Sequence, residues 1–145
     1  MRYRSGSIGR AVLARFDHGE KILPALTALC EREGIGAGWF FHFGAAGGGK
    51  LVTGPREDRL PPEPVWGEFP LPHEIVGMGS VALRGGTPSV HLHASLGRGK
   101  EALTGCIRGE GTAYIVVEAL VLEITGLAAA RLPDAATGLE LLSVE

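Results

Sequence analysis

The sequence predicts an α/β fold of the α+β type, in which a mixed, mostly antiparallel β-sheet carries one main α-helix. Two observations support this fold class. Apolar and polar residues alternate in several separate segments, which is the period of a half-buried strand. Only one segment, after residue 17, repeats its apolar residues at helical spacing. With 145 residues, the chain is expected to form a single domain, residues 1–145, with a hydrophobic core.

Composition limits the classes of partner. The hydrophobic fraction of 45% and the charged fraction of 21% are typical of a soluble globular protein. A net charge of −2 provides no electrostatic basis for binding nucleic acid or an anionic membrane. No apolar run approaches the roughly 20 residues that span a bilayer. The two cysteines, Cys30 and Cys106, do not make a disulfide framework, and no secretory signal is recognisable, so we expect a cytoplasmic protein.

The first strand is predicted over residues 8–16. Asp17 then serves as a helix N-cap, and Glu20, three residues later, completes a pattern close to a capping box. The helix is expected to run for about four turns and to stop at Gly34. Cys30 lies on its apolar stripe and is expected in the core. Pro24 is tolerated if the helix begins late.

A glycine-rich stretch follows the next predicted strand, residues 38–44. Residues 44–51, GAAGGGKL, match a phosphate-binding Walker A loop except that Leu51 replaces the hydroxyl residue that ligates magnesium. Prolines follow where that loop would open a helix, so nucleotide hydrolysis is not expected. We interpret the glycines as a hairpin turn that leads to a partner strand at residues 49–53.

Six of the nine prolines fall in residues 54–72, which predicts a long loop with a short edge strand at residues 65–68. A long strand over residues 73–83 and a turn at Gly85-Gly86 come next.

The segment 112–124 is apolar on both faces, which indicates a strand covered on both sides. A single helix cannot cover so much sheet, so the remaining apolar surface is expected to be a subunit interface. Glu118 interrupts this segment. It is either a partnered buried carboxylate or a site residue.

The most informative segment is SVHLHASL, residues 89–96. Its alternation predicts a strand in which His91 and His93 project from one face, together with Ser95. Residues 101–108 are expected to return as the second strand of a hairpin.

The turn between these strands, within residues 97–100, determines which residues face one another. A turn of two or four residues places Cys106 directly opposite His91 and Thr104 opposite His93, with Cβ atoms about 5 Å apart. A turn of three or five residues sends Cys106 to the other face. On one face, the two histidines and the cysteine are suitable ligands for one divalent metal ion. The alternative is that the histidines are ordinary polar residues on a solvated face, because the spacing is not that of a zinc ribbon.

Five blocks together resemble the plants-and-prokaryotes conserved (PPC) domain family. They are FDHGE (16–20), HEIVGMGSV (73–81), HLHASL (91–96), TGCI (104–107) and RLPDAATGL (131–139). The resemblance implies a mostly antiparallel sheet with a main helix, commonly assembled as a homotrimer. In plants, this domain follows AT-hook segments in nuclear proteins, whereas prokaryotic members are the domain alone and are often called predicted DNA-binding proteins. Residues 83–88 lack the Arg-Gly-Arg core of an AT-hook.

The resemblance also implies a metal, usually zinc, held by three histidines. Two of them match His91 and His93. The third belongs to a Gly-Gly-His-Leu block, and Cys106 stands at its position in this chain. A thiolate is itself a good zinc ligand, so the exchange preserves the donor set.

Three functions follow from these observations. The first is a zinc-binding homotrimer whose open fourth position holds water, with Glu74 or Glu118 as a base or as a partner of a ligand; whether it is an enzyme is left open. The second is a DNA-associated regulator, for which the only modest basic cluster is Arg2, Arg4, Arg10 and Arg15. The third is a small-molecule sensor that uses the metal or its pocket.

Overall fold

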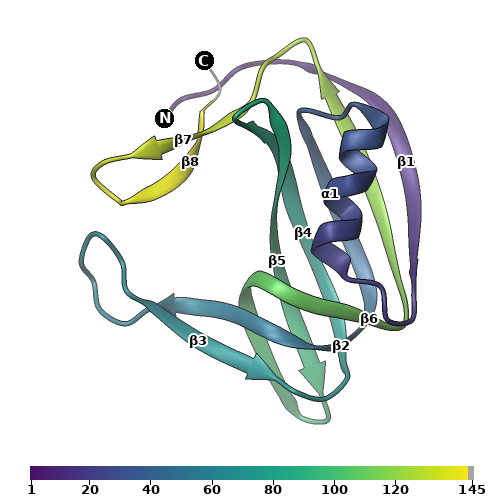
Figure 1. Ribbon diagram of the computed structural model, residues 1–145. Helices are drawn as coiled ribbons and strands as arrows, with labels where there is room; N and C mark the ends of the chain where they lie inside the picture. The colour runs from purple at the N-terminus through teal and green to yellow at the C-terminus, as the bar shows by residue number, and fades with distance from the viewer. Residues whose placement is uncertain (144–145) are drawn as a thin grey trace.

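The computed structural model describes residues 1–143 and, within that range, every side chain except that of Glu110. Residues 144–145 of the expected single domain lie outside this description. The elements are, in chain order, β1 (Ser7–Asp17), α1 (Ile22–Glu33), β2 (Gly38–Pro55), β3 (Pro64–Phe69), β4 (His73–Arg84), β5 (Thr87–Arg98), β6 (Glu101–Thr125), β7 (Ala130–Asp134) and β8 (Leu139–Ser143). A mostly antiparallel sheet with a single helix confirms the predicted fold class (Figure 1).

The strands form one sheet in the order β3-β2-β6-β5-β4-β7-β8, and β1 joins it by pairing with β6. Strand β4 also pairs with β2, so the path β2-β6-β5-β4 returns to its start and closes a small barrel-like ring. All pairs are antiparallel except the single parallel contact of β4 with β7 at Leu83 and Ala130. The predicted edge strand at residues 65–68 is confirmed as β3, which ends the sheet beside β2.

The helix begins at Ile22, later than the predicted N-cap at Asp17. The Glu20 carboxylate instead accepts a hydrogen bond of 2.6 Å from the Asp17 backbone N–H, which closes the turn before the helix. Pro24 therefore falls in the first helical turn, where its missing N–H costs nothing. Gly34 ends the helix at φ 66°, as predicted. None of the helical structure within residues 1–143 is long and apolar enough to cross a bilayer.

The helix packs its apolar stripe against the ring. Its buried residues Ile22, Leu26 and Cys30 meet core residues of the sheet such as Leu92 and Val121, which confirms the expectation for Cys30. Burial raises the pKa of the Cys30 thiol to about 11, so this thiol stays protonated.

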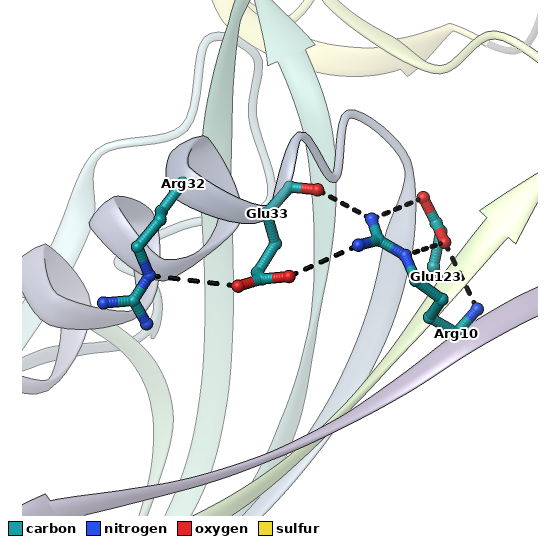
Figure 2. A network of polar contacts seen from close by, with 4 residues as sticks. All are labelled: Arg10, Arg32, Glu33 and Glu123. Carbon is teal, nitrogen blue, oxygen red and sulfur yellow. Dashed lines mark hydrogen bonds and ion pairs between the residues drawn. The ribbon is translucent and has the colours of Figure 1, made fainter.

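A charged clamp fastens the C-terminal end of α1 to the sheet (Figure 2). The Arg10 Nε on β1 donates to the Glu123 carboxylate on β6 at 2.9 Å. Its Nη2 donates to the Glu33 backbone carbonyl at 2.6 Å, and its Nη1 lies 3.3 Å from the Glu33 carboxylate. These contacts from Arg10 lower the pKa of Glu123.

Two glycines of β4 leave room for two large core side chains of β2. Gly79 lies opposite Phe40, and Gly77 lies opposite His42. A Cβ on Gly79 would collide with the Phe40 ring, and one on Gly77 would collide with the His42 ring. The two glycines of β4 are therefore required by the packing of these β2 rings and by the His91 and His93 backbone carbonyls of β5, which a Cβ would also meet.

The glycine-rich stretch is not the predicted hairpin turn. Strand β2 runs through it without reversing, from residue 38 to residue 55, and the ladder with β6 only shifts register there. Gly44 has φ 138°, and a Cβ at this position would overlap the Val116 carbonyl oxygen. The glycines thus supply β-bulges and close backbone approach rather than a turn.

The face of the sheet away from the core exposes a set of large apolar side chains. We call it the apolar sheet face; its members are Leu13, Trp39, Phe41, Phe43, Val76 and Met78. The registers of β1, β2, β4 and β6 align them on one side. Segment 112–124 is therefore covered by the core on one side and bare on the other within a single chain. Glu118 is exposed, so the expectation of a buried carboxylate is wrong.

Candidate metal centre

Strand β5 alternates as predicted. Leu92, Ala94 and Leu96 are buried in the core, so His91 and His93 project from the opposite face. His91 is half-buried and His93 is exposed.

The hairpin register differs from the predicted one by two residues. Strand β5 ends at Arg98 opposite Glu101, which leaves Gly99 and Lys100 as a two-residue turn, with Gly99 at φ 65°. Cys106 consequently lies opposite His93, and not opposite His91. Thr104 likewise lies opposite Ser95 instead of His93. A shift of two residues preserves the face, so Cys106 remains on the histidine side.

These three side chains converge, and we call them the His-His-Cys cluster. The His91 Nε2 lies 3.1 Å from the Cys106 Sγ and 3.1 Å from the His93 Nε2. All three candidate ligand atoms lie within 4.8 Å of one another. A tetrahedral zinc ion, with bonds of about 2.0–2.3 Å, holds pairs of such atoms about 3.3–3.6 Å apart. The two pairs that include His91 fit this spacing to within a few tenths of an ångström, whereas the His93 Nε2 and the Cys106 Sγ must approach each other from a separation of up to 4.8 Å. The donor set therefore fits zinc after a side-chain adjustment that draws His93 and Cys106 together.

The surroundings of the cluster are positively charged. Burial is the largest cause that lowers the pKa of His91 to about 4, and the charges of Arg131, His93 and Arg108 contribute to this shift in that order. Burial raises the pKa of Cys106, while Arg108 and Arg131 oppose that rise. His91 is thus neutral near pH 7 and ready to accept a cation, whereas the Cys106 thiol gives up its proton when a metal binds.

The structure does not bring Glu74 or Glu118 to the cluster. Glu74 lies opposite Gly97, four residues along β5 from His93, or about 13 Å at strand spacing. Glu118 on β6 lies opposite Phe43 on β2, and β5 lies two strand spacings beyond Phe43. The separation between Glu118 and β5 along this row is therefore about 14 Å. Neither carboxylate belongs to the group of candidate ligands.

Sequence reasoning missed Arg131, which the structure places beside the cluster. Its Nη2 donates a 2.8 Å hydrogen bond to the Ser80 Oγ, and Ser80 lies directly opposite His91. The only sequence signal was its position at the start of the RLPDAATGL block. Alternation or spacing could not reveal the contact, because it depends on how β7 crosses β4.

The fold has counterparts among solved structures. A metal-containing protein of Archaeoglobus fulgidus is similar with a TM-score of 0.87 and 27% identity, over 99% of each chain. A PPC protein of Pyrococcus horikoshii is similar with a TM-score of 0.83 and 26% identity, over 100% of this chain and 99% of that one. A candidate DNA-binding protein of Ralstonia eutropha shares the fold, with a TM-score of 0.78 and 19% identity over 92% and 90% of the two chains.

No curated protein matches the sequence. The family model of the Plants and Prokaryotes Conserved (PCC) domain, however, matches residues 3–125. This range contains α1, β1 to β6 and all three members of the His-His-Cys cluster. The chain therefore belongs to the Plants and Prokaryotes Conserved domain family.

Proposed function

We propose that this protein binds one zinc ion per chain through His91 Nε2, His93 Nε2 and Cys106 Sγ, with a fourth position open to water or a small ligand. The observation that carries the proposal is the convergence of these three atoms within 4.8 Å. Three protein ligands with one open position are typical of zinc sites that act on a bound molecule, whereas purely structural sites are closed by four. The similar Archaeoglobus protein, which is described as metal-containing, supports this assignment.

A second part of the proposal concerns assembly: the chain acts as a homotrimer packed through the apolar sheet face. Leu13 is 84% exposed and Val76 61% exposed in the single chain. Contiguous apolar patches of this kind mark interaction sites in soluble proteins. Self-association is the simplest way to cover the face, and the family resemblance supplies the number three.

The metal assignment is tested by elemental analysis of protein purified from zinc-supplemented cells. We expect close to one zinc per chain in the wild type and in Cys30→Ala, which removes the other cysteine from the core. His91→Ala is expected to lose most of the metal. A metal-free wild type, or equal zinc contents in all three proteins, would contradict the assignment.

A further inference from the structure

Arg131 reaches the metal cluster from a separate arm of the fold. Figure 1 shows the β7–β8 hairpin projecting from the β4–β5 region on the side away from α1, as the β2–β3 ribbon also does. The two arms approach each other where a Cβ on Gly138 would lie 3.2 Å from the Pro61 Cβ. From the β7–β8 hairpin, Arg131 donates a hydrogen bond of 2.8 Å to the Ser80 Oγ, and Ser80 lies opposite His91.

This guanidinium is not neutralised by the described part of the chain. No described carboxylate lies within ion-pair distance of Arg131. The carboxylate that acts on it electrostatically, Glu140, is held by Arg84 at 2.8 Å. The Arg131 Nε is buried and has no hydrogen-bond partner within residues 1–143. A partly buried cation without a counter-ion costs free energy, which an anionic ligand would recover.

A second cation lies on the same side. Arg108 is two residues from Cys106 on β6 and therefore shares its face, and it acts electrostatically on both Cys106 and His91. Neither histidine has a carboxylate among its described hydrogen-bond partners. A bound Zn²⁺ with one thiolate ligand would still carry one positive charge, so metal and Arg131 together present a strongly cationic site.

We propose that the zinc centre binds a small oxyanion, a carboxylate or a phosphate group, with one oxygen on the metal and another accepting hydrogen bonds from the Arg131 guanidinium. This inference rests on the proposed zinc site. The planar guanidinium matches two oxygens of one carboxylate or phosphate, which a point charge such as lysine does not. His93 is exposed in the single chain. It lies opposite Met78 of the apolar sheet face, so in the proposed homotrimer the ligand would reach the metal beside the interface between copies.

The competing interpretation gives Arg131 a structural role only, tying β7 to β4 through Ser80. A structural tie affects stability but leaves the response of the metal to anions unchanged. The two roles therefore separate in a binding measurement on folded, metal-loaded protein.

The experiment uses the full chain loaded with Co²⁺, whose thiolate charge-transfer and visible bands report the ligands directly. Acetate and inorganic phosphate are titrated separately at constant ionic strength, and the visible bands give a Kd for each. We expect at least one of the two anions to change the spectrum of the wild type. Arg131→Gln should retain the cobalt–thiolate band and bind that anion about ten- to a hundredfold more weakly. Arg131→Lys should be intermediate, and Arg32→Gln, which removes an exposed helix charge, should match the wild type.

The outcomes distinguish the two proposals. If wild-type protein shows no cobalt–thiolate band, both the zinc site and the oxyanion site are wrong. If the band forms but neither anion changes the spectrum, only the oxyanion site is wrong. Equal anion affinities in wild type and Arg131→Gln would assign Arg131 the structural role. Should Arg131→Gln fail to fold, Arg131→Lys and the wild-type titrations still decide the question. The anion that binds more tightly identifies the ligand as carboxylate or phosphate.

Discussion

His93 lies directly opposite Cys106 in the β5–β6 ladder, yet it is the diagonal neighbour His91 whose Nε2 lies 3.1 Å from the Cys106 Sγ. The imidazole of His91 reaches across the ladder and sits between the other two candidate ligands. The cluster is therefore built from one direct and one diagonal cross-strand relationship. Both depend on the same two-residue turn.

The first prediction concerns the identity of the third ligand. Cys106→Ala should weaken zinc binding by more than about a hundredfold. The loss of a residue that only hydrogen-bonds to a metal ligand already lowers metal affinity about ten- to a hundredfold, and the loss of a ligand should cost more. Cys106→His should recover most of the affinity, since the imidazole can donate a nitrogen from the same strand position. Competition with a chromophoric chelator at fixed pH measures all three proteins. Unchanged affinity in Cys106→Ala would remove Cys106 from the site.

The second prediction concerns His42, a core histidine near the cluster that sequence reasoning did not single out. It is 3% exposed, and neither ring nitrogen has a hydrogen-bond partner of good geometry. Burial lowers its pKa to about 4, and the nearby His93 backbone offsets only part of the shift. In the unfolded chain the His42 imidazole binds a proton near pH 6.5, whereas in the folded protein it becomes protonated only near pH 4.

Stability from His42 is therefore present above pH 6.5 and lost as the pH falls towards 4. The loss amounts to about 3 kcal/mol, at about 1.4 kcal/mol for each unit of pKa shift. His42→Leu should remove this part of the acid sensitivity and leave the free energy of unfolding near neutral pH unchanged or higher. Urea denaturation of metal-free protein at pH 7 and pH 4.5, at one protein concentration, measures the difference. An equally steep decline in His42→Leu would show that other groups cause it.

Much of the fold follows from patterns within the sequence. Alternation located the long strands, and Gly85-Gly86 was correctly expected to turn β4 into β5, with φ values of 58° and 88°. These features succeed because side-chain period and positive φ are local properties. The three candidate ligands of the cluster could also be predicted from the sequence, since all three residues occupy one face of adjacent segments.

The failures share a cause, which is dependence on distant neighbours. Gly44 resembles a turn glycine in sequence, but it is required by the backbone of Val116, more than seventy residues away. The observed hairpin register differs by two residues from the predicted one because the turn lies at Gly99 and Lys100, with the positive φ on Gly99, and not at the centre of residues 97–100. Arg131 lies on β7, and no periodicity in the sequence indicates where β7 pairs with β4.

The third prediction concerns assembly. The wild-type protein should have a mass of about three times 15.2 kDa by light scattering coupled to size exclusion. Leu13→Glu and Val76→Glu place a charge on the apolar sheet face at positions that are mostly exposed in the single chain, so each monomer should still fold. A buried, unpaired carboxylate would oppose packing between copies, so both variants should be smaller than the wild type.

Leu60→Glu is the matched control for assembly. Leu60 is 64% exposed but lies between β2 and β3, outside the apolar sheet face. This variant should keep the wild-type mass. A monomeric wild type would overturn the homotrimer, and loss of assembly in Leu60→Glu alone would place the interface elsewhere.

The last prediction is that this chain alone does not bind DNA tightly. Non-specific affinity for DNA comes mainly from cations that displace counter-ions at phosphates. The chain has 14 Lys and Arg against 16 Asp and Glu, and three copies at −2 would carry a formal charge of −6.

Part of the modest N-terminal cluster is also committed to acids within the fold. Arg10 is clamped between Glu123 and Glu33, as Figure 2 shows, and Arg15 pairs with Asp17 at 2.7 Å. Those guanidinium groups would have to exchange a carboxylate for a phosphate. We therefore expect no binding tighter than the micromolar range of non-specific complexes in anisotropy titrations against duplex DNA at near-physiological salt. Submicromolar affinity with a steep salt dependence would show that arginines of several subunits converge on one face, and would favour the regulator over the metal-centred function.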